Sequence, residues 1–264
     1  MENTADTANG IHAVLADDGQ QRSARRRRRR RYLPPQHGAW AMLVVPYLVG
    51  VLWAGPSWLQ LPLLVAWLGG YLLSYYLFLA VKTRRPSRVA RQVLVYSAVT
   101  VPAALLVVVL RPELLVFAPV YAVLLAVNAW YAWQRSERAL LNNLASVVQG
   151  CLMVPVAAMA AGVAPEEVLA PFVVVLLYFA GTVLFVKSTI RGRGDPRYLG
   201  GSIAFHGAAV VAAGVIAWPL AVPFGWFLVR AAWLPHRRLT PKQIGMIEIA
   251  NCAVLVVVLP LVTS

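Results

Sequence analysis

The residues of this chain that could act as an acid, a base or a cation stand within or beside long apolar stretches. Glu248 is the only carboxylate inside such a stretch, and a carboxylate removed from water requires a cation. Arg230 or Lys242 could supply it. His206 lies in another apolar stretch without a visible partner, which favours a structural role over a catalytic one. The candidate buried polar residues are therefore Asn142, His206 and Glu248.

Basic side chains follow several of the apolar stretches. Arg84, Arg88 and Arg91 are spaced i, i+4 and i+7, and a second pair, Lys187 and Arg191, is spaced i and i+4. Each set would share one face if its helix continued beyond the apolar stretch. Guanidinium groups match the geometry of phosphate, so these residues indicate a cytoplasm-facing site for an anion. The candidate anion- or lipid-binding residues are His37, Arg84, Arg88, Arg138, Lys187, Arg191 and Lys242. The alternative is that these cations only set the orientation in a membrane.

The sequence contains no pattern typical of a metal or nucleotide site. It lacks the CxxC, HExxH, Walker-type and GxGxxG patterns. Its two cysteines, Cys151 and Cys252, lie inside apolar stretches, where cysteine behaves as a small hydrophobic residue. We therefore expect no metal and no cofactor.

The composition indicates which solvent surrounds these residues. Of 264 residues, 60% are hydrophobic and only 13% are charged. A water-soluble domain of this size would have too little polar surface to cover itself. We therefore expect an all-α, polytopic membrane helical bundle.

Nine apolar stretches could form its helices, most of them near the roughly 20 residues that cross a bilayer core. They lie at about residues 38–55, 58–81, 92–110, 114–133, 140–162, 168–187, 202–218, 219–234 and 246–262. Residues 36–264 are thus predicted to form one transmembrane domain. Because Pro219 and Pro223 blur the boundary between the seventh and eighth stretches, eight spans with a re-entrant segment is the alternative.

The loop charges predict the orientation of the bundle. Every second loop carries several Lys or Arg residues, whereas the other loops carry Arg111 and the acidic residues Glu113, Glu166 and Glu167. This bias predicts a cytoplasmic N-terminus and an external C-terminus.

Residues 1–35 have no apolar periodicity and are predicted to be a disordered, cytoplasmic tail. Much of the net charge of +14 lies in the unbroken run Arg25 to Arg31. Such a run beside a first membrane helix attracts anionic lipid headgroups. No aromatic platform interleaves with the arginines, so membrane lipids are the expected partners and specific nucleic-acid binding is not expected.

Other polar and small residues within the stretches indicate helix packing. Asn128, Gln149 and Asn251 are predicted to form hydrogen bonds between helices. Small residues would let helix backbones approach closely. These are Gly69 and Gly70, Gly150 with Ala157 and Ala158, Gly181, and the run from Gly207 to Gly214.

Four segments resemble the YwiC-like family of bacterial integral membrane proteins. They are PPQHGAWAMLVVP from Pro34, NAWYAWQRSERALLNN from Asn128, VKSTIRGRGDPRY from Val186 and PKQIGMIE from Pro241. The resemblance extends from about Leu33 to the end of the chain. It implies a multi-pass protein of the bacterial inner membrane and no particular activity.

The chain is also distantly similar to the UbiA superfamily of intramembrane prenyltransferases. In that superfamily, the loops after the second and sixth spans carry aspartate-rich motifs that bind Mg²⁺ and a prenyl diphosphate. Here Ser74, Tyr75 and Phe78 stand at the first motif, and Asp195 is the one aspartate near the second. Mg²⁺ requires carboxylate oxygens, so a Mg²⁺-dependent prenyltransferase is not expected.

Three functions remain open. The first is binding of an anionic, phosphorylated or polyprenyl lipid through the basic loops, with or without turnover. The second is a metal-independent membrane transferase that uses His37 or Glu248 as acid or base. The third is a small-molecule or anion transporter, ranked last because the sequence has no clear internal repeat.

Overall fold

The computed structural model describes residues 39–263, and this part of the chain is helical and contains no strand. The predicted tail, with Arg25 to Arg31, and the candidate residue His37 lie outside the described residues. The main helices are α2 Ala39–Ala54, α3 Gln60–Thr83, α4 Ala90–Leu110, α5 Ala118–Trp133, α6 Leu140–Cys151, α7 Met153–Ala160, α8 Leu169–Val186, α9 Pro196–Ile216, α10 Ala221–Trp233 and α11 Pro241–Thr263. The short helical turns are η1 Pro86–Arg88, η2 Pro112–Phe117, η3 Pro165–Val168, η4 Lys187–Arg191, η5 Trp218–Leu220 and η6 Leu234–His236.

The helices occupy the predicted apolar stretches, which confirms the all-α bundle. Seven helical stretches of residues 39–263 are long and apolar enough to cross a membrane, and the shorter α2 is apolar as well. The stretch predicted at about residues 140–162 is helical over Leu140–Ala160 and is divided at Leu152 into α6 and α7. Pro155 has no N–H for the carbonyl of Cys151 and its ring crowds that carbonyl, which explains the interruption.

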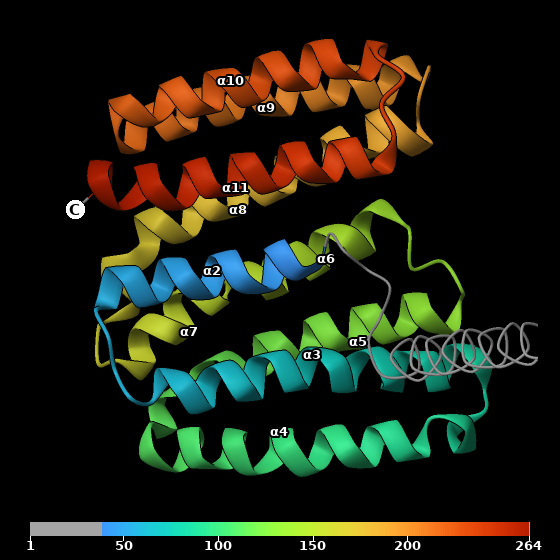
Figure 1. Cartoon of the computed structure of the whole chain (residues 1–264), viewed down its shortest axis with the longest axis vertical. Helices are drawn as coiled ribbons and strands as arrows, with labels where there is room; N and C mark the ends of the chain where they lie inside the picture. The colour runs from blue at the N-terminus through green and yellow to red at the C-terminus, as the bar shows by residue number, and fades with distance from the viewer. Residues whose placement is uncertain (1–38, 264) are drawn as a thin grey trace, which may run out of the picture. The chain divides into compact units, whose positions relative to one another are not determined.

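The boundary between the seventh and eighth predicted stretches is a break between two helices. Ala217 is extended, with φ −156° and ψ 121°, and Pro219 follows it in η5. The chain then returns as α10, which packs along α9 (Figure 1). The number of membrane crossings, nine or fewer, stays a prediction, because α10 has only 13 residues.

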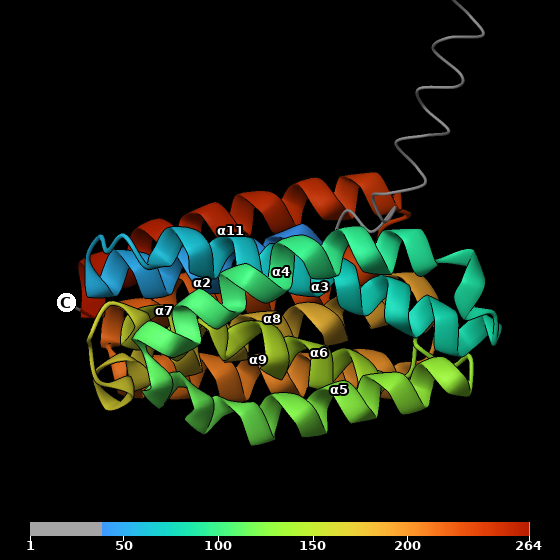
Figure 2. The same ribbon diagram turned by 90° about the horizontal axis from the view of Figure 1, so that it is seen from below.

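The helices of residues 39–263 form two layers. Figures 1 and 2 show α11, α2 and α3 side by side, with α8, the α6–α7 pair and α5 behind them. Helices α9 and α10 pack against the α8 and α11 edge, and α4 packs against α3.

Burial and exposure follow the expectation for a protein surrounded by lipid. Within the most apolar 18 residues of each stretch, 56% of the residues are buried in the α6–α7 stretch, against 11% in α3, α4 and α5. The centre of the bundle therefore lies at α6, α7 and α8. The outward residues are still apolar, as Val215 and Leu261 illustrate with exposed fractions of 82% and 76%. Apolar side chains over the outside of a helical bundle are typical of a surface that faces hydrocarbon.

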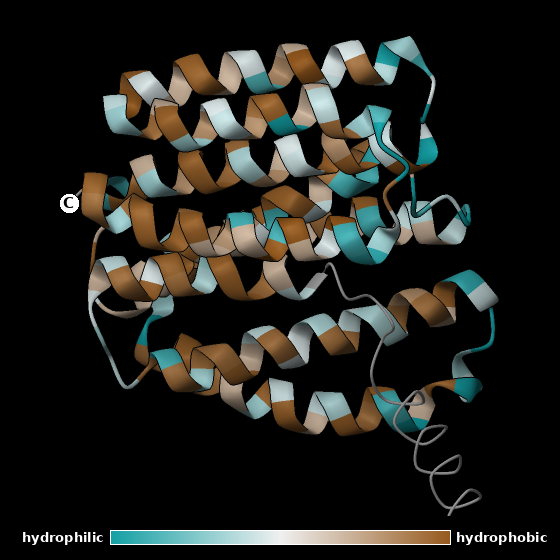
Figure 3. Cartoon of the chain, turned by 45° about the horizontal axis from the view of Figure 1, so that its top comes forward, coloured by the Kyte–Doolittle hydropathy of each residue, from teal (hydrophilic) through white to brown (hydrophobic). Residues whose placement is uncertain are grey.

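The basic loops lie at one end of the helices. The α3–α4, α5–α6, α8–α9 and α10–α11 connections share that end, which Figure 3 shows as hydrophilic. We call it the basic end. The connections at the other end carry Arg111, Glu113, Glu166 and Glu167. The assignment of the basic end to the cytoplasm stays a prediction.

Several of the predicted close approaches of small residues are present. A side chain at Gly150 would meet the carbonyl oxygen of Met42 at 3.1 Å, which explains how α2 packs directly on α6. At Gly69 the neighbour is Thr100 of α4. The prediction was wrong at Gly207, where an added side chain would meet nothing within 4 Å. A helix face that points away from the other helices needs no small residue.

Candidate functional site

Arg230 and Glu248 form a buried ion pair between α10 and α11. Arg230 is 1% exposed and Glu248 is 9% exposed. Arg230 donates from Nη1 to Oε1 of Glu248. The prediction that Glu248 has a cationic partner is therefore confirmed, and Arg230 is that partner. The other candidate, Lys242, is exposed at the start of α11.

The second oxygen of Glu248 is held by α8. Oε2 accepts a hydrogen bond from Thr182 Oγ1 at 2.8 Å and another from the Tyr178 hydroxyl at 3.1 Å. The Tyr178 hydroxyl also lies 3.4 Å from Cys252 Sγ. Tyr178 and Thr182 are one helical turn apart and so present their hydroxyls on the same face of α8. Both carboxylate oxygens thus have donors, which is the arrangement a buried carboxylate needs.

His206 on α9 extends the network on the side of Arg230. Its Nε2 lies 3.3 Å from Nη2 of Arg230, and its Nδ1 lies 2.7 Å from the carbonyl oxygen of Ser202. A guanidinium can only donate, so Nε2 accepts and Nδ1 carries the proton. His206 therefore has partners, although none was visible in the sequence. The predicted structural role is consistent with these contacts, while its function stays untested.

Aromatic rings enclose the guanidinium group. The Cζ atom of Arg230 lies 4.5 Å from the ring centre of Phe185 and 5.4 Å from that of Phe227. Gly181 gives His206 its space, because a side chain at Gly181 would lie 2.9 Å from Nε2 of the imidazole. We call Arg230, Glu248, Tyr178, Thr182 and His206 the buried charged centre.

Three buried polar atoms on the helices of the buried charged centre have no hydrogen-bond partner among residues 39–263. They are Arg230 Nε, Ser202 Oγ and Asn251 Nδ2. The other amide atom of Asn251, Oδ1, accepts from Trp226 Nε1 at 3.2 Å, which confirms the predicted bond between helices. Glu248, His206 and Asn251 are recognisable as candidates in the sequence, whereas the hydroxyls of Tyr178 and Thr182 are not. Hydroxyl groups on apolar helices are too common to be a signal.

A second polar network joins α5 to α6. Asn128 Nδ2 donates to Gln149 Oε1 at 3.0 Å, as predicted, and Asn128 Oδ1 accepts from Ser146 at 3.0 Å. Asn142 is buried, and its Nδ2 donates to the carbonyl oxygen of Glu137 at 2.8 Å. This bond ties the start of α6 to the preceding loop. The contacts of the second network are those expected of a packing element.

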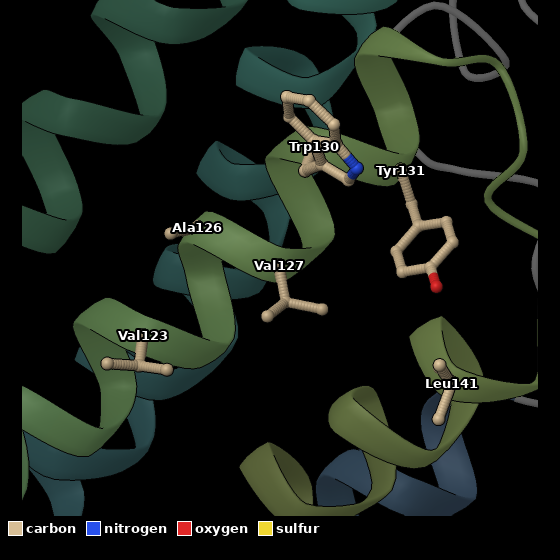
Figure 4. A pocket seen from close by; sticks show the side chains of 6 residues that line it. All are labelled: Val123, Ala126, Val127, Trp130, Tyr131 and Leu141. Carbon is tan, nitrogen blue, oxygen red and sulfur yellow. The ribbon is translucent and has the colours of Figure 1, made fainter.

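An open, apolar groove of about 580 Å³ lies between α5 and the start of α6 (Figure 4). Its lining residues are Val123, Ala126, Val127, Trp130, Tyr131 and Leu141. Val127 and Tyr131 extend from α5 toward the helix that carries Leu141 (Figure 4). Trp130 is 54% exposed and Leu141 is 66% exposed, so the groove opens to the surroundings of the helices. The groove is not recognisable in the sequence, because its residues resemble those of any lipid-facing helix surface.

The arrangement of the basic residues differs from the predicted one in the α3–α4 loop. Helix α3 ends at Thr83, and Arg84 follows in a left-handed conformation with φ 54°. Arg88 lies in η1 and Arg91 in α4, so the prediction that these three arginines share one helix face was wrong. Pro86 explains the break, because it disfavours helical conformation in the residue before it. By contrast, α8 continues past Val186 as the π-helical turn η4, which holds Lys187 and Arg191.

Contacts along the basic end connect its loops. Lys82 Nζ lies 2.6 Å from Glu137 Oε1 and joins the end of α3 to the α5–α6 loop. Arg138 of that loop is close enough to Arg191 for their charges to interact. Further along, Arg193 donates to the carbonyl oxygen of Arg237 at 3.3 Å. Most of the candidate cations are exposed, namely Arg84, Arg88, Arg138, Arg191 and Lys242. Lys187 is half-buried, and its Nζ lies over the ring of Tyr198, 5.4 Å from the ring centre. Whether these residues bind a common ligand stays a prediction.

Glu137 and Asp195 are acidic groups of the basic end. Partial burial alone would raise the pKa of Glu137, but the hydrogen bond from Lys82 and the charges of Lys82 and Arg138 outweigh it and lower that pKa. Within residues 39–263, no three His, Cys, Asp or Glu side chains come together as metal ligands would.

These features define a class, the polytopic helical membrane proteins with ionisable groups inside the bundle. Residues 33–158 match the model of the family described as YwiC-like protein. An uncharacterized protein of Haemophilus influenzae is 32% identical over 234 residues, covering 86% of this chain and 97% of that protein. The uncharacterized protein YwiC of Bacillus subtilis is 30% identical over 235 residues, covering 83% and 92%. The chain belongs to the YwiC-like family. No solved structure matches it, and the similarity to the UbiA superfamily stays a prediction.

Proposed function

We propose that this protein binds an anionic lipid at the basic end, with the apolar chain of the lipid in the α5–α6 groove and its phosphate beside Arg138 and Arg191. The observation that carries the proposal is the position of the groove. Leu141 lines it, and Arg138 stands three residues earlier in the chain. A ligand with an apolar chain and an anionic head would therefore satisfy both surfaces at once.

The charges of the basic end favour a phosphate. Arg138 and Arg191 repel each other across the gap between the α5–α6 loop and η4. An anion between two guanidinium groups converts that repulsion into two attractive interactions, and phosphate accepts the paired hydrogen bonds that guanidinium donates. Both side chains are exposed, so neither must be desolvated before a headgroup reaches it.

The chemistry of the groove favours a lipid tail over a polar ligand. All six lining residues are aliphatic or aromatic. Their polar atoms are at the ring ends of Trp130 and Tyr131, near the basic end of α5, where aromatic residues sit at the level of lipid headgroups. A polyprenyl or acyl chain along α5 would replace the chain of another lipid, so its binding would require little change in the contacts with water.

A metal-independent transferase is the less favoured alternative. Of its two proposed acid or base groups, His37 lies outside the described residues, and Glu248 is buried and ion-paired with Arg230. A general base must lie within reach of the proton that it removes from the substrate. Lipid binding without turnover is therefore the function proposed.

Native mass spectrometry of the purified protein with a polyprenyl monophosphate tests the proposal. We expect Arg138→Ala and Arg191→Ala to retain less lipid than the wild type, and Val127→Trp, which fills the groove, to do the same. Arg197→Ala is the matched control, because it removes an exposed cation at the start of α9 and the same end of the bundle.

Two further ligands separate head from tail. Inorganic phosphate should bind weakly and respond to the arginine variants but not to Val127→Trp. The neutral polyprenol should respond to Val127→Trp but not to the arginine variants. Equal retention of the polyprenyl monophosphate by the wild type and all these variants would contradict the proposal, and leave orientation in the membrane as the role of the arginines.

A further inference from the structure

We propose that the buried charged centre is a second binding site, which takes up a small planar monoanion, such as nitrate or a carboxylate, together with one proton. The site lies among α8, α9, α10 and α11 and shares no residue with the α5–α6 groove. The proposal therefore stands independently of lipid binding. It rests on the charge balance of the centre, on its unpaired donors and on its distance from the basic end.

The charge balance of the centre couples an anion to a proton. Arg230 is a permanent cation, and Glu248 is its carboxylate counter-ion. When Glu248 takes up a proton, Arg230 is left as an unbalanced charge inside the bundle, which is strongly unfavourable. A monoanion that replaces the carboxylate at the guanidinium restores neutrality. Proton and anion then bind together with no net change of charge.

The helices of the centre carry unpaired polar groups that an incoming anion would satisfy. Arg230 Nε has no hydrogen-bond partner among residues 39–263, so one of the three guanidinium nitrogens is free to donate to an anion. Ser202 Oγ and Asn251 Nδ2, each one helical turn from a member of the centre, are buried and also without a partner among residues 39–263. Buried donors without acceptors are costly, and an anion supplies acceptors. A carboxylate, or a planar ion with three oxygens, can accept two parallel hydrogen bonds from a guanidinium group.

The centre is accessible from the basic end over a short distance. Glu248 lies seven residues after the start of α11, which corresponds to about 10 Å along the helix. Arg230 lies three residues before the end of α10, at the same end. The cations of the basic end would raise the local concentration of anions there. Glu248 retains the larger exposed fraction of the pair and is therefore the side from which exchange begins.

Among the titratable groups around the ion pair, Glu248 is the one that takes up the proton. Helix α8 contributes Tyr178, α10 contributes Arg230, α9 contributes His206 behind Arg230, and α11 contributes Cys252. The described residues of α2, which pack on α11, contain Tyr47 as their one titratable group, and its hydroxyl donates to the carbonyl oxygen of Gln60. A proton on His206 would place a second cation against Arg230. A proton on Glu248 adds no cation, and the incoming monoanion replaces the carboxylate charge that is lost.

Nitrate is the probe of choice, because it is a planar monoanion that does not itself titrate between pH 5 and 8. Its binding to the purified full chain would be followed by the shift of the thermal unfolding temperature at increasing nitrate concentration. Uptake of one proton with each nitrate predicts that the apparent Kd falls by about tenfold for each unit of decreasing pH. Arg230→Gln should abolish the shift, and Arg197→Gln, an exposed cation outside the centre, should keep the wild-type response.

Glu248→Gln imitates the protonated acid and makes the sharpest test. It should bind nitrate equally well at pH 5 and pH 8, and at pH 8 more tightly than the wild type. Where Glu248→Gln does not fold, Tyr178→Phe serves instead, because it removes one donor from the carboxylate and should extend nitrate binding to higher pH. Wild-type binding that is absent or independent of pH overturns the proposal, as does a full response in Arg230→Gln. Loss of lipid binding in the groove variants would not affect it.

Discussion

The two partners of the buried ion pair are not equivalent, and their removal should have different consequences for stability. Arg230→Gln leaves a buried carboxyl group, which can become neutral by taking up a proton. Glu248→Gln leaves a buried guanidinium, which cannot lose its charge at any pH that the protein survives. The first variant should therefore recover stability in acid, and the second should not.

The size of the loss follows from the cost of leaving one member of a buried ion pair without its partner. Glu248→Gln should lose about 3 to 5 kcal/mol at pH 7 and at pH 5. Arg230→Gln should lose less at pH 5 than at pH 7, because a protonated carboxyl group leaves no uncompensated charge in the bundle.

The free energy of unfolding in mixed detergent micelles, measured in a buffer without small monoanions, is the appropriate assay. The double variant Arg230→Gln, His206→Gln should keep the acid recovery, which would assign the proton to Glu248. Replacement of both partners by apolar residues, as in Arg230→Met with Glu248→Leu, should be less damaging than Glu248→Gln alone. An equal and pH-independent loss in the two single variants would refute the reasoning.

Three further outcomes are expected. Gly181→Ala would push its methyl group against the His206 imidazole, 2.9 Å away, and should lower the unfolding temperature, with Gly181→Ser at least as damaging. Lys82→Gln should cost less than about 1 kcal/mol at neutral pH, because Lys82 lowers the pKa of Glu137. That cost should disappear as the pH falls through the lowered pKa and Glu137 is protonated, and a loss that persists in acid would point to packing instead. A reporter fused beside Glu113 should be active only outside the cytoplasm, and cytoplasmic activity would reverse the predicted topology.

The helices were predictable because lipid imposes a simple pattern on the sequence. The stretch from Gln60 to Thr83 must satisfy its backbone groups internally, and a run of apolar residues of that length leaves only a helix. The division at Leu152 and the π-helical turn at Lys187 were not predictable in the same way. They depend on how proline and local hydroxyl groups are accommodated by neighbouring helices.

The candidate site was predictable in part. Glu248 could be singled out, and its need for a cation restricted the partner to a few residues. The choice of Arg230 over Lys242 required the structure, since both lie within reach on the sequence and only packing determines which side chain points inward. The α5–α6 groove was not predictable, because Val127 and Leu141 are ordinary lipid-facing residues until the two helices are placed together.

The sequence by itself determined the solvent of this protein, because apolar length and loop charge are properties of single segments that require no knowledge of their neighbours. Only the tertiary structure decided which polar residues share a site. Tyr178, His206, Arg230 and Glu248 come from four helices, and contacts among them depend on the rotation and depth of each helix in the bundle. Hydrophobic periodicity determines neither quantity, since lipid accepts any apolar face equally well.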